Sequence, residues 1–145
     1  MRKVSVSRIK NVICELCVQS NMVLRSDILR AIQKALNKET KGRAKNILRV
    51  LLQNAEIARR ELRPICQDTG MVSVYLEIGQ GIFLVGGGLE DAVSAGVKEG
   101  YKRGRLRRSI VKSPLDRVNT GTNTPPVTTI DIVKGNKLKI TVAPK

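Results

Sequence analysis

The hydrophobic period of the chain changes near Pro64. Before that residue, apolar side chains recur every three or four positions, which is the spacing that places them on one face of a helix. After Gly70, the segment "MVSVYLEIG" alternates apolar and polar residues and is rich in β-branched types, which is typical of a strand. A chain that begins with helices and continues with strands indicates an α+β fold.

Three amphipathic segments precede Pro64, at residues 9–20, 26–38 and 42–61, and short links join them. Each segment carries its apolar residues on one face, so each needs an apolar partner. We predict that the three helices form an N-terminal helical bundle and that residues 1–63 are a helical region.

Residues 64–145 are expected to form an α/β region. "GIFLV" indicates a second strand, and "VTTIDIV" and "KLKITVAP" flank "KGNK" in the manner of a hairpin. Residues 89–110 read as a helix with glycines four positions apart, which would let another backbone approach closely. The predicted architecture is a helical bundle followed by a mostly antiparallel sheet with a packed helix.

The chain is strongly basic, with a formal net charge of +15. Eight Lys or Arg against two acidic residues lie between Lys98 and Arg117. Such a surface attracts polyanions and small acids alike, so a small nucleic-acid-binding module is one hypothesis. The low aromatic content of 2% and the lack of a recognised docking motif argue against it.

The cell compartment is predicted from what the chain contains. No apolar run has the length of a bilayer span, and "MRKVSVSRIKN" has no continuous apolar core of a secretory signal. Three cysteines, an odd number without framework spacing, indicate reduced thiols. We therefore expect a cytoplasmic protein that does not insert in a membrane.

Two motifs have plain structural interpretations. Cys14 and Cys17 form C-x-x-C, but within a predicted helix rather than at its N-terminus, where a redox pair gains its low pKa. With no histidine and one other cysteine in the chain, a structural zinc site is also disfavoured. The run Gly86-Gly87-Gly88 lacks the residues of a nucleotide-binding loop and is interpreted as a tight turn.

The segment "RPICQDTG" is harder to explain as structure alone. Cys66 stands where the period changes and is followed at once by Gln67 and Asp68. A thiolate is the usual protein ligand of an iron–sulfur cluster, and the neighbouring polar groups could face whatever such a metal binds. Spacing alone leaves two interpretations open: a metal ligand, or a buried cysteine before an Asp-Thr-Gly turn.

Several stretches resemble one enzyme family. "LLQNAEIARRELRPICQDTGMVSVYLEIG", "GVKEGYKRGRLRRS", "NTGTNTPP" and "KLKITVAPK" are similar, in the same order, to motifs of the class I iron–sulfur-dependent fumarate hydratase and L(+)-tartrate dehydratase family. The similar region is the N-terminal part of the alpha subunit and covers essentially the whole chain.

The resemblance implies a hydro-lyase that adds or removes water across the double bond of a small dicarboxylate. It implies that Cys66 is a ligand of a [4Fe-4S] cluster, that Gln67 and Arg107 bind substrate, and that Asp68 is catalytic. An arginine fork suits a substrate carboxylate. The resemblance does not choose between fumarate/malate and tartrate/oxaloacetate.

The chain departs from the family pattern in two ways. Thr122 stands where the family's loop has an Asp, and the chain ends at Lys145, where the family continues with a glycine-rich segment and its other cluster cysteines. We therefore expect one incomplete domain of a longer alpha subunit, inactive alone. Its expected partners are the C-terminal half of that subunit and a beta subunit or domain, in an oligomer. A non-functional remnant of the enzyme is the remaining alternative.

Overall fold

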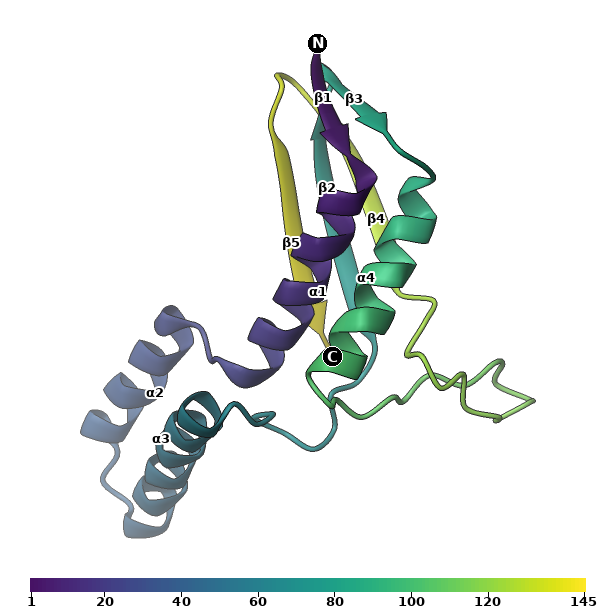
Figure 1. Ribbon diagram of the computed structural model, residues 1–145. Coiled ribbons are helices and arrows are strands. Elements are labelled where there is room, and N and C mark those ends of the chain that lie inside the picture. Colours follow the sequence, from purple (N-terminus) through teal and green to yellow (C-terminus); the bar gives the residue numbers. More distant parts are fainter. The chain divides into compact units, whose positions relative to one another are not determined.

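The computed structural model describes residues 1–145 and has an α+β fold (Figure 1). Its elements, in chain order, are β1 (Arg2–Ser5), α1 (Val6–Met22), α2 (Ser26–Lys38), α3 (Gly42–Glu61), β2 (Val72–Gly79), β3 (Ile82–Val85), α4 (Leu89–Arg103), β4 (Val127–Val133) and β5 (Leu138–Pro144). The chain divides into two compact units, one formed by residues 1–18 with 68–145 and the other by residues 19–67.

Strand β2 is the centre of a three-stranded mixed sheet with the order β4-β2-β5. It pairs parallel with β4, where Ser73 lies opposite Val127, and antiparallel with β5, where Val72 lies opposite Pro144. β1 and β3 form a separate two-stranded parallel sheet. The long strand β2 therefore pairs with two strands that begin about fifty residues or more after it ends.

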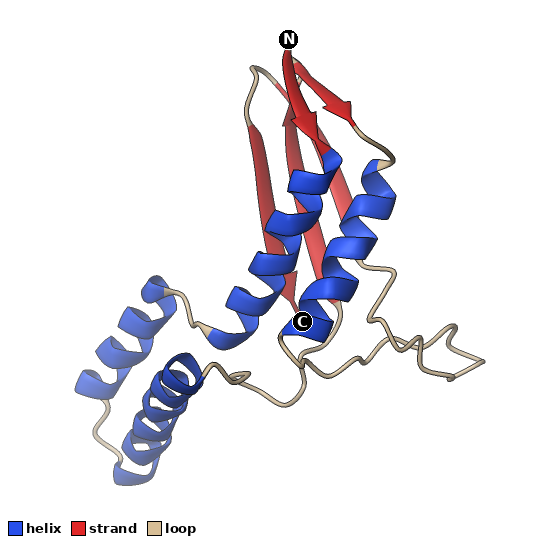
Figure 2. Cartoon of the chain, in the orientation of Figure 1, coloured by secondary structure: helices blue, strands red, loops and turns tan.

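The core of this first unit lies between the sheet and two helices. α1 and α4 run side by side along one face of the sheet (Figures 1 and 2). Alternate residues of β2 point to that face and are buried, as the alternation in the sequence predicts. The buried side chains on α1, β2 and α4 include Ile9, Ile13, Cys17, Val72, Val74, Leu76, Ile78, Val93, Val97 and Tyr101.

The second unit contains the end of α1, helices α2 and α3, and the loop up to Gln67. α2 has no buried residue, and α3 buries Ala55 and Ala58. α3 ends at Glu61, its C-cap residue Leu62 has a left-handed backbone with φ of 52°, and Pro64 follows. None of the helices in residues 1–145 combines the length and apolarity that a bilayer span requires.

The prediction of an N-terminal bundle is wrong. Residues 6–18 of α1 belong to the unit of the sheet, and only α2 and α3 pair as a helical hairpin. Helical periodicity shows that a helix has an apolar face, but it does not show which element that face meets.

The prediction of a mostly antiparallel sheet is also wrong. The proposed hairpin strands β4 and β5 are present, but β2 lies between them, and β4 is parallel to β2. The four-residue link is long enough for a hairpin, so the local pattern could not reveal the inserted strand. The predicted helix 89–110 ends earlier, at Arg103, because Arg105 is left-handed with φ of 50°.

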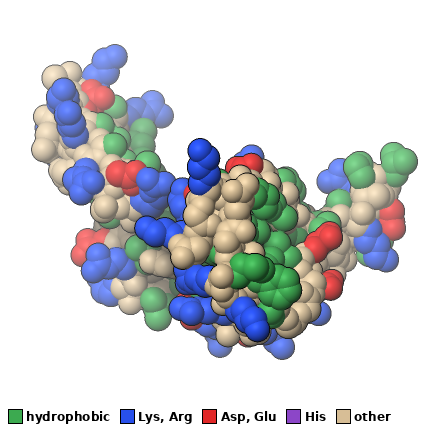
Figure 3. All heavy atoms as spheres, turned by 90° about the horizontal axis from the view of Figure 1, so that it is seen from above, with side chains coloured by type: hydrophobic (Ala, Val, Ile, Leu, Met, Phe, Trp, Pro, Cys, Tyr) green, Lys and Arg blue, Asp and Glu red, His purple; other side chains and the backbone are tan.

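The chain carries 27 Lys and Arg residues against 12 Asp and Glu residues, so its surface is basic. On the face shown in Figure 3, Lys and Arg side chains are spread among the others, and Asp and Glu are fewer. The five ion pairs that the chain forms all lie between exposed or half-exposed side chains. Such pairs contribute little to stability, so most of the positive charge faces solvent without compensation.

Candidate functional site

Asp68 begins a tight turn that leads into β2. Its carboxylate Oδ1 accepts a hydrogen bond from the Gly70 amide at 3.2 Å, and its side chain is exposed. Gly70 has φ of +56°, and a Cβ there would overlap the backbone carbonyl of Lys145. The Asp-Thr-Gly sequence is therefore needed for this turn: the aspartate closes it and the glycine alone fits it.

Thr69 ties this turn to the segment that carries Arg107. The Thr69 hydroxyl donates to the backbone carbonyl of Arg107 at 2.7 Å, although 38 residues separate the two. Tyr101, fully buried near the end of α4, donates its hydroxyl to the Thr69 carbonyl at 2.7 Å. The structure thus brings the turn of Asp68 and the backbone of Arg107 together.

Asn123 forms a second connection between the same two segments. Its side-chain Nδ2 donates to the Gly70 carbonyl at 3.0 Å. Its Oδ1 accepts from the Ser109 amide at 2.7 Å and from the Ile110 amide at 3.3 Å. Asn123 is fully buried, so these bonds satisfy an amide group that would otherwise be costly to bury.

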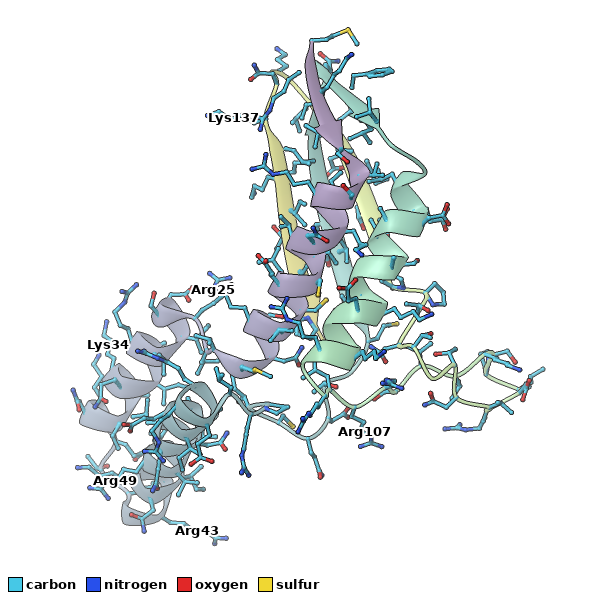
Figure 4. All side chains as sticks on the ribbon, viewed as in Figure 1. Arg25, Lys34, Arg43, Arg49, Arg107 and Lys137 are labelled. Carbon is cyan, nitrogen blue, oxygen red and sulfur yellow. The ribbon has the colours of Figure 1, made fainter.

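Arg107 projects its side chain from the loop that follows α4 (Figure 4). The neighbouring Leu106 is buried, and its amide donates to the Tyr101 carbonyl at 3.0 Å, which fixes the backbone just before Arg107. The guanidinium of Arg107 is exposed and makes no ion pair within residues 1–145. The backbone here is anchored while the charged group faces solvent, which suits recognition of an external anion.

Cys66 and Gln67 lie at the end of the second unit, in the loop after α3, and both are exposed. The residue before Cys66 is held at two points: the Ile65 amide donates to the Asn21 carbonyl at 2.8 Å, and Asn54 Nδ2 donates to the Ile65 carbonyl at 2.8 Å. Cys66 is therefore an accessible free thiol on an anchored loop, not a buried structural cysteine.

Cys14 and Cys17 are buried thiols inside α1, which agrees with the structural interpretation of this motif. Burial raises the pKa of the Cys17 thiol to about 12, and the neighbouring Cys14 adds to the effect. Burial also raises the pKa of Cys14. Because a metal ligand or nucleophile must be a thiolate, neither residue is suited to that chemistry.

The family model described as Fumarate hydratase (Fumerase) matches residues 10–145. The Escherichia coli K12 protein "Fumarate hydratase class I, aerobic" is 36% identical over 117 residues, covering 79% of this chain and 20% of its own length. The Escherichia coli K12 "Fumarate hydratase class I, anaerobic" is 40% identical over 91 residues, covering 61% of this chain and 16% of its own.

"L(+)-tartrate dehydratase subunit alpha" of Escherichia coli K12 is 27% identical over 135 residues, covering 91% of this chain and 44% of its own length. This chain belongs to the class I fumarate hydratase and L(+)-tartrate dehydratase alpha family. The family consists of hydro-lyases, and this member spans less than half the length of these curated relatives.

The fumarate hydratase family uses iron–sulfur clusters, which are usually held by several cysteine thiolates. No group of three or more His, Cys, Asp or Glu side chains in residues 1–145 is placed to hold a metal ion. Cys66 is the one accessible thiol, and Cys14 and Cys17 are buried with raised pKa values. The residues of this chain therefore do not by themselves fit a four-iron cluster.

The sequence of this fumarate hydratase family member did not reveal the residues that join its two site segments. Thr69 and Asn123 both lie within the stretches that resemble family motifs, but neither was given a role. The sequence offered one signal for their role: each is a polar residue beside or near a glycine, in the Asp-Thr-Gly turn and in the loop "NTGTNTPP". Their pairing depends on contacts across 38 and 53 residues, which no local pattern encodes.

Proposed function

We propose that this chain is the N-terminal portion of an iron–sulfur hydro-lyase that reversibly hydrates a small dicarboxylate. In this proposal it is one incomplete domain of a longer alpha subunit. It becomes active only with segments that correspond to the remaining length of its relatives and with a beta subunit or domain. The substrate is fumarate/malate or tartrate/oxaloacetate.

The observation that carries the proposal is the hydrogen bond between Thr69 and Arg107. It joins the turn of Asp68, which holds a carboxylate, to the loop of Arg107, which holds a guanidinium. Family membership supports the reaction class. A carboxylate and a guanidinium carried by two anchored backbone segments are the groups that dicarboxylate hydration needs: one to handle a proton and one to bind an acid group.

In the assembled enzyme, each residue has one task. Arg107 pairs with a substrate carboxylate through its planar fork, and the Gln67 amide hydrogen-bonds the substrate. Asp68 assists the proton transfer at the carbon beside the departing or incoming hydroxyl. Cys66 supplies one cluster ligand, and the other ligands come from segments outside these 145 residues. The three cysteines form no disulfide, which fits the reducing compartment, the cytoplasm, that we propose for the protein.

The proposal is tested by supplying the absent segments. The chain is co-expressed with a polypeptide that covers the remaining length of a tartrate dehydratase alpha subunit, and with its beta subunit. Iron content, the visible charge-transfer absorption and turnover of fumarate, malate and tartrate are then measured anaerobically. We expect cluster and turnover from the assembly, loss of both in Cys66→Ser, and neither from the chain alone. Robust turnover by the pure chain would contradict the half-subunit proposal.

The role of Arg107 is tested in the same assembly. Arg107→Lys keeps the charge but loses the fork, so kcat/KM should fall by roughly 30- to 1000-fold, or about 2–4 kcal/mol. Lys102→Ala and Arg103→Ala are matched controls, because these residues are exposed basic side chains at the end of α4. They should change kcat/KM little.

The nucleic-acid hypothesis predicts a different result for the same variants. If the basic stretch binds phosphates, each of the three substitutions should weaken DNA or RNA binding similarly, and the affinity should depend steeply on salt. The low aromatic content of 2% argues against a nucleic-acid-binding surface, because such surfaces commonly stack bases on aromatic side chains. An assembly that binds neither cluster nor nucleic acid would favour the third candidate, a folded remnant of the enzyme.

A further inference from the structure

We propose that Asn123 is a positioning residue, which holds the turn of Asp68 and the loop of Arg107 at a fixed separation. The proposal rests on the proposed function for its chemical purpose, but its structural content can be measured without activity. It gives a role to the loop that carries Asn123, to which the hydro-lyase proposal assigns none.

The first support is the placement of the Asn123 amide. It has no exposed surface, and it contacts both segments at once: the Gly70 carbonyl on one side and the Ser109 and Ile110 amides on the other. One atom of the amide donates and the other accepts, so this single side chain satisfies both sides at once. Asn123 also has φ of 59°, a left-handed conformation that asparagine tolerates better than most residues.

The second support is that the Asn123 connection runs beside the Thr69 connection. Thr69 and Gly70 are neighbours, and their partners Arg107 and Ser109 are two residues apart. Two such connections between the same two segments prevent one segment from rotating about the other, which a single hydrogen bond cannot do. Tyr101 holds the same turn to α4 through the Thr69 carbonyl.

The third support is the contrast between backbone and side chain at Asp68 and Arg107. The side chains of Asp68 and Arg107 are both exposed. Thr69, which follows Asp68, and Leu106, which precedes Arg107, are buried. A site of this kind fixes the backbone from which each functional group extends and leaves the exposed part of the side chain accessible to a ligand. A displacement of about 1 Å can reduce a rate by roughly 100-fold, so the separation of the two backbone segments matters.

The first test uses NMR on the full chain, with Asn123→Asp, Asn123→Ala and Thr69→Val. Asn123→Asp keeps the oxygen that accepts from the Ser109 amide but loses the N–H that donates to the Gly70 carbonyl. The chemical shifts of residues 68–70 should therefore change, while the Ser109 amide stays protected from hydrogen exchange. Asn123→Ala should speed exchange of the Ser109 amide by roughly 10-fold and shift both Asp68 and Arg107. Thr69→Val keeps the side-chain shape and should shift Arg107.

The control is Asn119→Ala. Asn119 is an exposed residue of the same loop, and it bonds the Arg108 carbonyl but not the turn of Asp68. Its loss should leave residues 68–70 unshifted. If Asn123→Ala changes shifts only near residue 123, with Asp68 and Arg107 unmoved, the positioning role is wrong. If Asn123→Ala fails to fold, the isosteric Asn123→Asp decides: unmoved shifts at residues 68–70 would overturn the positioning role.

The second test separates positioning from general stability in the assembled enzyme. If Asn123 acts through Arg107, then Asn123→Ala and Arg107→Lys should each lower kcat/KM, and the double variant should be no worse than Arg107→Lys alone. Additive losses would mean that Asn123 acts elsewhere and would overturn the proposal. An inactive wild-type assembly would contradict the proposed function, whereas the NMR result would still decide the positioning role.

Discussion

Gly100 of α4 lies directly against Cys17 of α1: a Cβ at Gly100 would stand 2.7 Å from the Cys17 Cβ and 2.9 Å from the Cys14 carbonyl oxygen. One turn earlier, a Cβ at Gly96 would stand 2.7 Å from the Lys10 carbonyl oxygen. The predicted close approach of another backbone is therefore confirmed at two of the three glycines. At Gly104 the nearest atoms belong to Leu106 and Gly100, so that glycine does not face α1.

Gly100→Ala should destabilise the chain. The added methyl group would meet the backbone of α1, and such overpacking costs about 1–3 kcal/mol, of which the better helix propensity of alanine offsets up to about 1 kcal/mol. Urea unfolding followed by circular dichroism gives the free energy. Gly42→Ala is the control, because nothing lies within 4 Å of that position at the start of α3. It should be neutral or stabilising, and an equally neutral Gly100→Ala would contradict the close packing.

Tyr101→Phe should lower the free energy of unfolding by about 1–2 kcal/mol, since it leaves the Thr69 carbonyl without the hydroxyl that it accepts from. Tyr75→Phe is the matched control: this tyrosine stands on β2 with 41% of its surface exposed. The same denaturation experiment measures both. Equal effects of the two substitutions would show that the buried hydroxyl is not what stabilises the turn.

The three thiols should differ in reactivity. Cys66 is exposed, whereas Cys14 and Cys17 are buried with raised pKa values. Iodoacetamide at pH 8 should therefore label one cysteine per native chain and three in denaturant, as mass spectrometry would count them. Native Cys66→Ser should take up no label. Rapid labelling of a second site would mean that α1 opens more readily than its packing indicates.

Stability should fall at alkaline pH because of Cys17. Burial raises the pKa of this thiol from 9.0 to about 12, so the folded state holds the proton more tightly than the unfolded state. The contribution is complete below pH 9 and is lost as the pH rises through 12, with up to about 4 kcal/mol at stake. Unfolding measured from pH 8 to 11 should show a steeper decline in the parent chain than in Cys17→Ala. Parallel slopes would contradict the raised pKa.

Local patterns predicted the local elements well. The segments 26–38 and 42–61 match α2 and α3, because helical periodicity depends on residues three and four apart. The pairing of β2 could not be predicted in this way, because its partner strands β4 and β5 lie far along the chain. Alternation of apolar residues does not show which strand pairs with which side of β2. The strand β1 was missed because four residues are too few for a reliable alternation.

In the candidate site, too, the local features could be predicted from the sequence and the long-range contacts could not. The turn at Asp68 and the exposed arginine at 107 could be expected from the sequence, because an Asp-Thr-Gly run and a motif resemblance mark them. The connections through Thr69, Tyr101 and Asn123 could not. Their side chains find backbone partners 32 to 53 residues away, and a buried asparagine looks like a loop asparagine until the fold is known.

The central place of β2 also determines the order in which the chain can fold. When residues 72–79 emerge during synthesis, neither neighbouring strand has been made, since both come from residues 127–144. Helices α2 and α3 can form at once from contacts between near residues, whereas the apolar face of β2 waits through the synthesis of some fifty further residues. During that interval both edges of β2 lack their partner strands, and unpaired strand edges of this kind promote misassociation.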